Sequence, residues 1–336
     1  MSEIKVKVAD EEETKKWDSH IEKSPQGSIF HQYDFLKIME KYSNSKLHLL
    51  IGYKGQQPIG LFPIFEISKG PISTVFSPPP YLLIPHLGPV LLNYETLNQR
   101  KIESLNNGFI EGCLNWINRN IRPKFIYILT VRNYTDVRPF QWNNFHVNPN
   151  FTYILDLNLG EEGLFNNFDS TRRTNIRKSS KDNIRVKVGG LEAVNFILEL
   201  VKKRYEEQNK NCIDLAYFRD VYNMLPKNQI SPYLAEVENE PIGGIVALKY
   251  KGNVYTWQGC AKPITTNLPF NDFVIWNIIK DSIKMGLKEF DLVGANTLRL
   301  CSYKSWFNPR LAEYYEIKKG TKIMNLFKKM YNGVLR

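Results

Sequence analysis

Two stretches of the sequence repeat one pattern, and this repeat decides the architecture. The first is LHLLIGYKGQQPIGLFPIFEI at residues 47–67, and the second is YLAEVENEPIGGIVALKY at residues 233–250. Each has a β-prone run, a polar turn, and then Pro-Ile-Gly at the start of another β-prone run. The tripeptides begin at Pro58 and Pro241, about half the chain apart. Each stretch predicts a two-stranded β-hairpin, and the recurrence predicts two related halves.

The segments around the hairpins also recur in the same order. Apolar residues at helical spacing over residues 194–201 precede the second hairpin, and shorter helical segments precede the first. After each hairpin we expect a strand, a long helix and a buried strand. In the first half these are residues 89–92, 95–118 and 124–132, and in the second half residues 254–260, 272–285 and 289–293. The order helix, hairpin, strand, helix, strand therefore occurs twice.

This order of elements is similar to that of GNAT acyltransferase domains. The resemblance implies an α/β (α+β) protein with a tandem GNAT-like acyl-CoA N-acyltransferase fold, two similar halves that each have a mixed sheet flanked by helices. We expect the two GNAT-like domains at residues 1–155 and 156–320. Apolar residues at helical spacing among lysines predict a basic amphipathic helix at residues 321–336, which either docks on the protein or lies on a membrane surface.

The composition fits two folded domains without a membrane span. The chain has 336 residues, of which 43% are apolar and 13% aromatic, enough for two cores. It has no apolar run of about 18 residues, and its N-terminus lacks the apolar centre of a signal peptide. Its four cysteines are scattered without metal-ligand spacing, so we expect reduced thiols, no metal and no disulfides in a cytoplasmic protein.

The net charge of +11 favours a polyanionic partner. RNA, nucleotide-sugar phosphates, CoA and an anionic membrane face all have the required charge. A basic surface that only solubilises the protein is the alternative, and charge alone does not choose among these.

Four motifs, taken in order, carry a resemblance to a known family. They are SIFHQYDFLKIME at residues 28–40, STRRTNIRKSSKDNIRVKV at residues 170–188, EFDLVGAN at residues 289–296 and SYKSWF at residues 302–307. Together they resemble the Fem-type (FemAB-like) aminoacyltransferases of the GNAT superfamily, which attach amino acids to peptidoglycan precursors. The likeness covers most of the chain, but Val293 stands where the family has the first glycine of Asp-Leu-Gly-Gly.

The resemblance implies an acyltransferase of cell-envelope biogenesis with no tightly bound cofactor. Its donor would be a substrate, either acyl-CoA or aminoacyl-tRNA. Larger family members carry a long helical hairpin thought to suit tRNA, and this sequence has no such charged heptad pair. It is similar to the compact members and to GNAT-like enzymes expected to use acyl-CoA, so the donor stays open.

Acyl transfer to an amine needs a deprotonated nucleophile and stabilisation of the tetrahedral oxyanion. No Ser-His-Asp or Cys-His arrangement is legible from the spacing, so we expect direct transfer without a covalent enzyme intermediate. The resemblance implies that Lys304, beside Tyr303, supplies positive charge to the oxyanion. The alternative is a surface lysine that follows a strand.

Two basic features are expected to hold phosphates. The resemblance implies that Lys37 grips the acceptor nucleotide, although amphipathic helices also place lysines in solvent. Arg172, Arg173, Arg177 and Lys178 form a basic cluster in which Arg173 and Arg177 share one helical face. Like charges at this spacing are unfavourable unless an anion compensates, and arginine binds phosphate bidentately. An exposed basic helix is the alternative.

Five further residues are candidates for the substrate site. Tyr255 and Trp257 alternate on one face of a predicted strand. The resemblance implies that this strand borders the donor cleft, and core packing is the alternative. Asn271 and Asp272 open the next helix, and either is also able to cap it. Asp291 either orients an amine or bonds to backbone. Tyr81, in a proline-rich loop, is the candidate for the wall of an acceptor groove, unless the loop is only a rigid connection.

The leading hypothesis is an N-acyltransferase that moves an acyl or aminoacyl group onto an amine of a phosphate-bearing glycan or peptide-glycan precursor. One alternative is an acetyl-CoA-dependent N-acetyltransferase of an amino sugar or small amine. Another is a non-catalytic RNA-binding protein with a vestigial GNAT fold. The expected partners are a nucleotide- or lipid-linked glycan precursor and charged tRNA. We expect a monomer, in the cytoplasm or peripheral at the inner face of the membrane.

Overall fold

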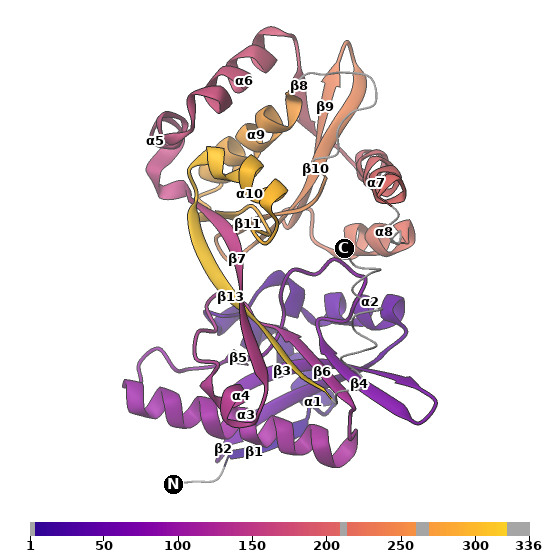
Figure 1. Cartoon of the computed structure of the whole chain (residues 1–336), viewed down its shortest axis with the longest axis vertical. Helices are drawn as coiled ribbons and strands as arrows, with labels where there is room; N and C mark the ends of the chain where they lie inside the picture. The colour runs from indigo at the N-terminus through magenta and orange to yellow at the C-terminus, as the bar shows by residue number, and fades with distance from the viewer. Residues whose placement is uncertain (1–3, 209–213, 260–268, 321–336) are drawn as a thin grey trace. The chain divides into compact units, whose positions relative to one another are not determined.

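The computed structural model describes residues 4–208, 214–259 and 269–320, which form two compact units (Figure 1). The helix predicted at residues 321–336 lies outside the described residues. Each unit is a mixed β-sheet with helices packed on it, so the predicted class, a tandem of two similar α/β halves, is confirmed.

The division into units differs from the expected domains at two places. The boundary between the halves falls after residue 150 and not after residue 155, and a C-terminal segment changes sides. Among the described residues, the first unit comprises residues 4–150 and 313–320, and the second comprises residues 151–312. The sequence assigned residues 313–320 to the second domain. They form part of a strand that pairs with a strand of the first unit, because chain order does not dictate which sheet edge a terminal strand joins.

The sheet of the first unit has one parallel neighbour pair. Its strands, in spatial order, are β1 (Ile4–Val8), β2 (Lys46–Lys54), β3 (Gln57–Lys69), β4 (Ile72–Ser77), β6 (Phe125–Leu129) and β13 (Arg310–Gly320), with the short β5 (Val90–Leu91) on β3. The helices are α1 (Glu11–Lys23), α2 (Tyr33–Ser43), α3 (Gln99–Asn120) and α4 (Arg138–Trp142), with the 3-10 turn η1 (Ile29–His31). Strands β4 and β6 are parallel, and the other neighbours are antiparallel.

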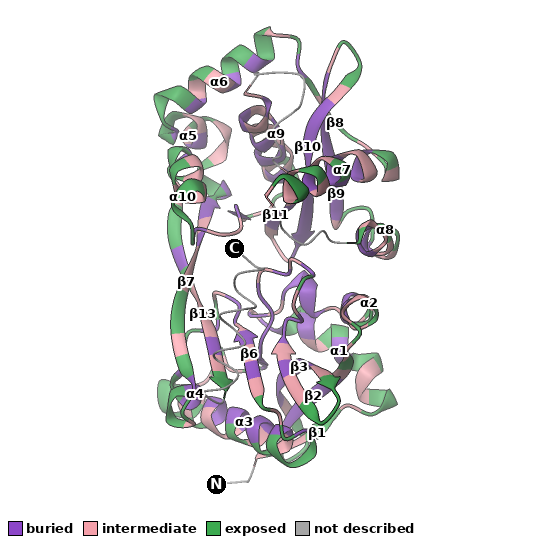
Figure 2. Cartoon of the chain, turned by 45° about the vertical axis from the view of Figure 1, so that its right-hand side comes forward, coloured by how far each residue is buried: buried purple, intermediate pink, exposed green. Residues whose placement is uncertain are grey.

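The sheet of the second unit repeats this plan. Its strands, in spatial order, are β7 (His146–Asp156), β12 (Glu289–Asp291), β11 (Asn253–Gly259), β10 (Glu240–Tyr250), β9 (Ile230–Val237) and β8 (Arg185–Val188). The helices are α5 (Gly160–Asn167), α6 (Ser170–Lys181), α7 (Leu191–Glu207), α8 (Leu215–Met224), α9 (Phe270–Lys284) and α10 (Leu298–Lys304), with the 3-10 turns η2 (Leu157–Leu159) and η3 (Ser305–Phe307). Strands β9 and β10 are buried along almost their whole length, as Figure 2 shows. Here β11 and β12 are the parallel pair.

The predicted recurrence of hairpin, strand, helix and strand is present, with one correction. In the first unit the strand after the hairpin is β4, at Ile72–Ser77, and not residues 89–92. Those residues form only the short β5. Prolines between β4 and β5 cannot donate to a strand ladder, so the longer pairing falls before them.

The glycine of each Pro-Ile-Gly tripeptide is explained by an aromatic ring from the long helix of its unit. A Cβ atom at Gly60 would lie 2.5 Å from Cε1 of Phe109 in α3. A Cβ atom at Gly243 would lie 2.3 Å from Cζ of Phe270 in α9. Both rings are fully or almost fully buried. The repeated tripeptide is therefore a packing motif, since only glycine lets the helix approach the hairpin this closely.

The parallel strand pairs of the two units, β4–β6 and β11–β12, end differently, and the candidate site lies where the second pair ends. In the second unit β11 and β12 pair only as far as Tyr255 and Asp291, whereas β11 continues to Gly259 beside β10. The β10–β11 register shifts so that Trp257 is the extra residue of a β-bulge. Bulges increase local twist and are common next to active sites. Strands β11 and β12 therefore separate beyond this point.

In the first unit the proline-rich loop occupies the corresponding place. Strands β4 and β6 pair as far as Ser77 and Ile128. The backbone N–H of Leu87 then donates a 2.8 Å bond to the carbonyl of Leu129, and Leu87 forms a parallel bridge with Thr130. In the described part of the second unit, no segment extends the β11–β12 pairing in this way.

Candidate active site

Lys304 is bonded to the residues that follow β12, just after its pairing with β11 ends. It is the last residue of α10, and its ammonium group donates hydrogen bonds to the carbonyl oxygens of Val293 and Gly294, the latter at 3.2 Å. Both carbonyls belong to the turn that follows β12. In this structure the ammonium therefore binds backbone carbonyls. That Lys304 supplies positive charge to the oxyanion remains a prediction.

The same turn is fixed from its other side by Asp291 and Thr152. The hydroxyl of Thr152 in β7 donates a 2.5 Å bond to Oδ1 of Asp291, which also accepts the backbone N–H of Val293 at 2.8 Å. The backbone N–H of Gly294 donates to the Thr152 hydroxyl at 3.3 Å. Of the two roles weighed for Asp291, the structure therefore shows backbone bonding, by a carboxylate that is only 4% exposed.

Val293 has a backbone conformation that its side chain disfavours. Its φ angle is 50°, and that of Gly294 is 81°, so both residues are in the left-handed region. A β-branched residue there is uncommon and strained. The glycine that the family has at this position would relieve the strain. The departure of this sequence from Asp-Leu-Gly-Gly was the only sequence signal of this turn.

Arg172 is not available to hold a phosphate. Its Nη1 lies 2.6 Å and 2.5 Å from the two carboxylate oxygens of Asp272, and the two side chains are 7% and 2% exposed. The prediction for Arg172 from the charge cluster is wrong. Helix α6 turns residue 172 toward α9, whose first turn carries Asp272. The hydroxyl of Tyr303 donates to the same carboxylate at 2.8 Å, so Asp272, which the sequence suggested only as a helix cap, is a residue of the site.

The other three members of the basic cluster lie on the outer side of α6. Arg177 and Lys178 are exposed and Arg173 is half-buried, and none of the three forms an ion pair within the described residues. Arg173 donates a 2.7 Å bond to the carbonyl of Asn166, and the Arg177 guanidinium lies 5.2 Å from the ring centroid of Phe165. These cations keep the capacity to contact an anion.

Tyr255 and Trp257 are both buried, each with 6% exposure. The Trp257 ring packs on Phe218 and Tyr217 of α8, with centroids 5.0 Å and 6.0 Å away. The structure thus supports the core-packing alternative for the Trp257 side chain. Its backbone, at the bulge of β11, is the part of the residue nearest the strand separation.

Asn271 does not cap α9. The helix begins at Phe270, its N-cap is Pro269, and no side chain bonds the cap position. Asn271 lies in the first turn, where its Oδ1 atom is buried without a hydrogen bond from the described residues. Its role in the substrate site remains a prediction.

Lys37 and Tyr81 belong to the first unit. The Lys37 ammonium pairs with Glu40 on its own helix, which raises the pKa of the lysine through a side-chain hydrogen bond. The lysine is about half exposed, at 49%. Tyr81 lies in the loop after β4 at 36% exposure, with a φ angle of 68°. Their assignment to the acceptor site remains a prediction.

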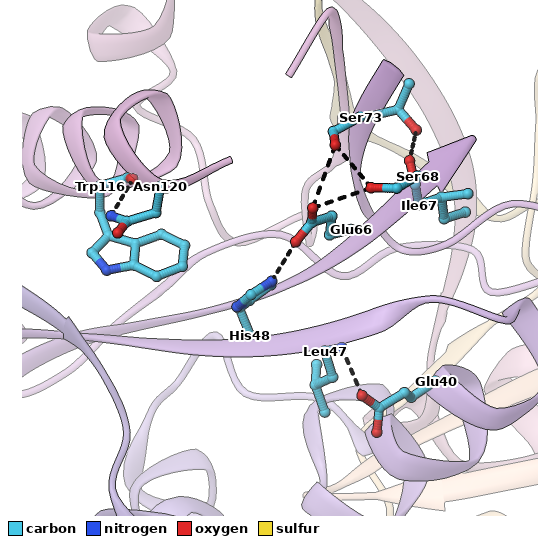
Figure 3. A network of polar contacts seen from close by, with 10 residues as sticks. Glu40, Leu47, His48, Glu66, Ile67, Ser68, Ser73, Trp116 and Asn120 are labelled. Carbon is cyan, nitrogen blue, oxygen red and sulfur yellow. Dashed lines mark hydrogen bonds and ion pairs between the residues drawn. The ribbon is translucent and has the colours of Figure 1, made fainter. Parts of the chain in front are cut away.

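The first unit also holds a polar network on β2, β3 and β4 (Figure 3). Nε2 of His48 lies 2.9 Å from Glu66, and Ser68 and Ser73 donate to the other carboxylate oxygen at 3.2 Å and 3.4 Å. Burial acts to raise the pKa of Glu66, but the hydrogen bond from His48 and the one from Ser68 outweigh it and lower the pKa. The serines bond to the carboxylate and not to the imidazole, so this network lacks the serine–histidine contact of a nucleophilic serine.

Within the described ranges, no three His, Cys, Asp or Glu side chains are grouped so that they could hold a metal ion. The described cysteines are free thiols, and burial raises the pKa of Cys113. Cys212 and Cys260 lie outside the described residues. No described helix combines the length and apolar character needed to cross a membrane.

The separated parallel strands, the bulge and the following helix define the class of the second unit. Residues 169–305 match the family model of the acetyltransferase (GNAT) domain, so this unit is a GNAT domain and the chain is an acyltransferase. The match favours an enzyme over the non-catalytic alternative.

The Fem-type resemblance is confirmed at the level of the fold. The crystal structure of FemX matches with a TM-score of 0.70 at 11% identity, over 93% of this chain and 96% of that one. The structure of L-PGS from Bacillus licheniformis has a TM-score of 0.59 at 11% identity, over 98% of each chain. A tandem GNAT protein from the clavulanic acid biosynthesis pathway has a TM-score of 0.55 at 9% identity, over 94% of this chain and 98% of that one. The search of curated proteins found no match.

Proposed function

We propose that this acyltransferase moves an acyl or aminoacyl group onto an amine of a phosphate-bearing glycan or peptide-glycan precursor. The observation that carries the proposal is the position of Lys304, whose ammonium bonds the turn that follows β12, just after the β11–β12 pairing ends at Asp291. The exposed cations of α6 in the same unit supply the capacity to contact phosphate.

The reaction is direct transfer. The amine of the acceptor attacks the carbonyl carbon of the donor, the bond to the donor oxygen or sulfur breaks, and the amine proton leaves with the departing group. Lys304 places positive charge near the developing oxyanion. Removing one such donor typically lowers kcat by about 10²–10³-fold.

The donor is either aminoacyl-tRNA or acyl-CoA, bound as a substrate. The Fem-type motifs and fold support the aminoacyl donor, and the match to the acetyltransferase family supports acetyl-CoA with an amino sugar or small amine as acceptor. The aminoacyl version implies charged tRNA and a nucleotide- or lipid-linked precursor as partners. Contact with a membrane would depend on residues 321–336, which lie outside the described part of the chain.

The test is calorimetric binding of acetyl-CoA, charged tRNA and a nucleotide-linked amino sugar to the wild type and to Lys304→Ala, followed by turnover with whichever ligands bind. Low-micromolar binding of acetyl-CoA supports the acetyl-CoA branch, and binding of tRNA or nucleotide sugar without CoA supports the Fem-type branch. Lys284→Ala is the matched control, since Lys284 is exposed near the far end of α9.

Lys304→Ala is expected to bind its ligands almost as well as the wild type and to turn over about 10²–10³-fold more slowly. The Lys284→Ala variant should keep the wild-type rate. A wild type that binds none of the three ligands contradicts the proposed substrates. An active wild type whose rate survives Lys304→Ala contradicts the role of the lysine.

A further inference from the structure

A buried ion pair brackets Tyr303, the residue next to Lys304. The hydroxyl of Tyr303 donates to Asp272, and the backbone carbonyl of Tyr303 accepts a 3.0 Å bond from Nη2 of Arg172. Asn175, one turn along α6 from Arg172, donates a 2.7 Å bond to the other oxygen of Asp272. Both the side chain and the backbone of Tyr303 are therefore fixed by the same pair.

The residues after Lys304 contact the same guanidinium. The Cζ atom of Arg172 lies 4.3 Å from the ring centroid of Tyr303, 4.9 Å from that of Trp306 and 5.2 Å from that of Phe307. Cation–π contacts of this kind strengthen as the cation loses water. Arg172 thus holds the chain on both sides of Lys304, from α10 into η3.

Stability alone does not account for this arrangement. A buried ion pair is often no more stabilising than apolar residues of similar volume, because both charges lose their water. The pair does, however, fix the relative orientation of three helices, because its directional hydrogen bonds join α6, α9 and α10. This orientation sets the position of the Lys304 backbone. It therefore determines whether the Lys304 ammonium reaches the carbonyls of Val293 and Gly294.

We propose that Arg172 and Asp272 are positioning residues for Lys304 and act through Tyr303. The inference rests on the proposed function of Lys304 and extends it to a charge pair that bonds neither the Val293–Gly294 turn nor the lysine itself. Loss of the pair releases the end of α10, so the ammonium leaves the two carbonyls and becomes more accessible.

The test measures the reactivity of individual lysine amines under native conditions, with acetic anhydride as the probe and mass spectrometry as the readout. The rate at Lys304 is compared with the rate at Lys178, which is exposed on α6. Lys249 provides a second reference, because it is 6% exposed in the same unit and its ammonium bonds to Ser231 at 3.0 Å. A rise at Lys249 would report loosening of the whole unit.

Asp272→Asn and the double variant Arg172→Met/Asp272→Asn are expected to raise the relative rate at Lys304 by about tenfold, equivalent to about 1.4 kcal/mol of local opening. Tyr303→Phe, which removes only the hydroxyl bond, should raise it less. Arg173→Gln, the neighbouring arginine on the same helix, should leave it unchanged. The double variant keeps the test valid if Asp272→Asn alone does not fold, because it leaves no unpaired buried charge.

An unchanged Lys304 rate in the folded double variant overturns the proposal, and so does an equal rise at Lys249. The labelling needs no substrate, so its result is separate from the fate of the proposed reaction. With an active donor and acceptor pair, the double variant is also expected to lower kcat while KM stays within about twofold, because positioning affects the transition state more than binding.

Discussion

The ring of Phe270 lies directly on Gly243, so that a Cβ atom at residue 243 would be only 2.3 Å from its Cζ atom. Gly243→Ala is expected to lower the free energy of unfolding by about 2 kcal/mol, since extra atoms in a filled core typically cost about 1–3 kcal/mol. Urea unfolding followed by circular dichroism measures the change.

Gly190→Ala is the matched control for this substitution. A Cβ atom at Gly190 would meet no heavy atom within 4 Å, and its φ angle is −96°. Its cost should stay below about 1 kcal/mol, the value of a weakened N-cap. Phe270→Leu added to Gly243→Ala should restore part of the loss. Equal losses of unfolding free energy in Gly190→Ala and Gly243→Ala would show that close packing against Phe270 is not the reason for the glycine at residue 243.

Val293→Gly is expected to raise the free energy of unfolding by about 0.5–1 kcal/mol. The left-handed conformation at φ 50° strains a β-branched residue by at least about 1–2 kcal/mol, which exceeds the entropic cost of a glycine. Gly294→Ala, at φ 81°, should have the opposite sign. Thermal unfolding of both variants decides the matter, and a destabilised Val293→Gly would mean that the valine side chain contributes more than its strain costs.

Removing one partner of the Arg172–Asp272 pair is expected to cost more than removing both. Arg172→Met leaves a buried carboxylate without its cation and should lower the free energy of unfolding by about 3–5 kcal/mol. Arg172→Met/Asp272→Asn should recover at least about half of that loss. A double-mutant cycle with denaturant unfolding measures the coupling. Additive losses would indicate that the two side chains do not interact in solution.

The buried His31 should make the first unit less stable in acid. Burial lowers its pKa from 6.5 to about 4, and its ring is bonded to Ser28 at 2.8 Å and to the carbonyl of Gly88 at 3.2 Å. The unfolded histidine takes up a proton below pH 6.5, whereas the folded one stays neutral until about pH 4. Its stabilising contribution is therefore complete above pH 6.5 and is lost toward pH 4, by at most about 3 kcal/mol.

Unfolding of the wild type and of His31→Gln at several pH values tests this contribution. The glutamine variant should be less stable at pH 7 and should show a shallower slope between pH 6.5 and 4. Burial lowers the pKa of His86 to about 3. Part of the dependence of stability on pH therefore remains in both proteins. Identical slopes would indicate that His31 is protonated in the folded protein.

The exposed cations of α6 are expected to contact phosphate. Arg177→Gln/Lys178→Gln should weaken binding of a nucleotide sugar or of tRNA by about tenfold and reduce its dependence on salt, because fewer counterions are released. Lys284→Gln, an exposed cation on α9, is the control and should bind as the wild type does. Titrations at two salt concentrations measure both effects. An unaltered affinity would indicate that these two cations do not contact the ligand and only keep the surface of the protein soluble.

The sequence predicted those features that repeat or follow a period. The two hairpins follow from β-prone runs joined by polar turns. The parallel strand pair of each half, and the long helix that connects its two strands, follow from β-prone runs and apolar spacing. The Pro-Ile-Gly repeat was visible as a pattern, but its cause was not. Each glycine lies on a strand and the ring that it contacts, Phe109 or Phe270, lies on a separate helix.

The roles of charged side chains were the least predictable part. Charge density placed Arg172 with Arg173, Arg177 and Lys178 as a phosphate site, but helical rotation turns Arg172 inward and leaves the others outside. Trp257 was likewise a candidate lining residue, and the packing of α8 covers it.

Local sequence determines which residues form a helix or strand, because backbone propensity and the spacing of apolar side chains act over a few residues. It determined the tandem architecture of this protein and pointed to Lys304 through a short motif. Which charges face each other was decided only by the tertiary structure. Asp272 and Arg172 come from helices far apart in the sequence, and burial makes their pairing obligatory, because an unpaired charge in that place would cost several kcal/mol.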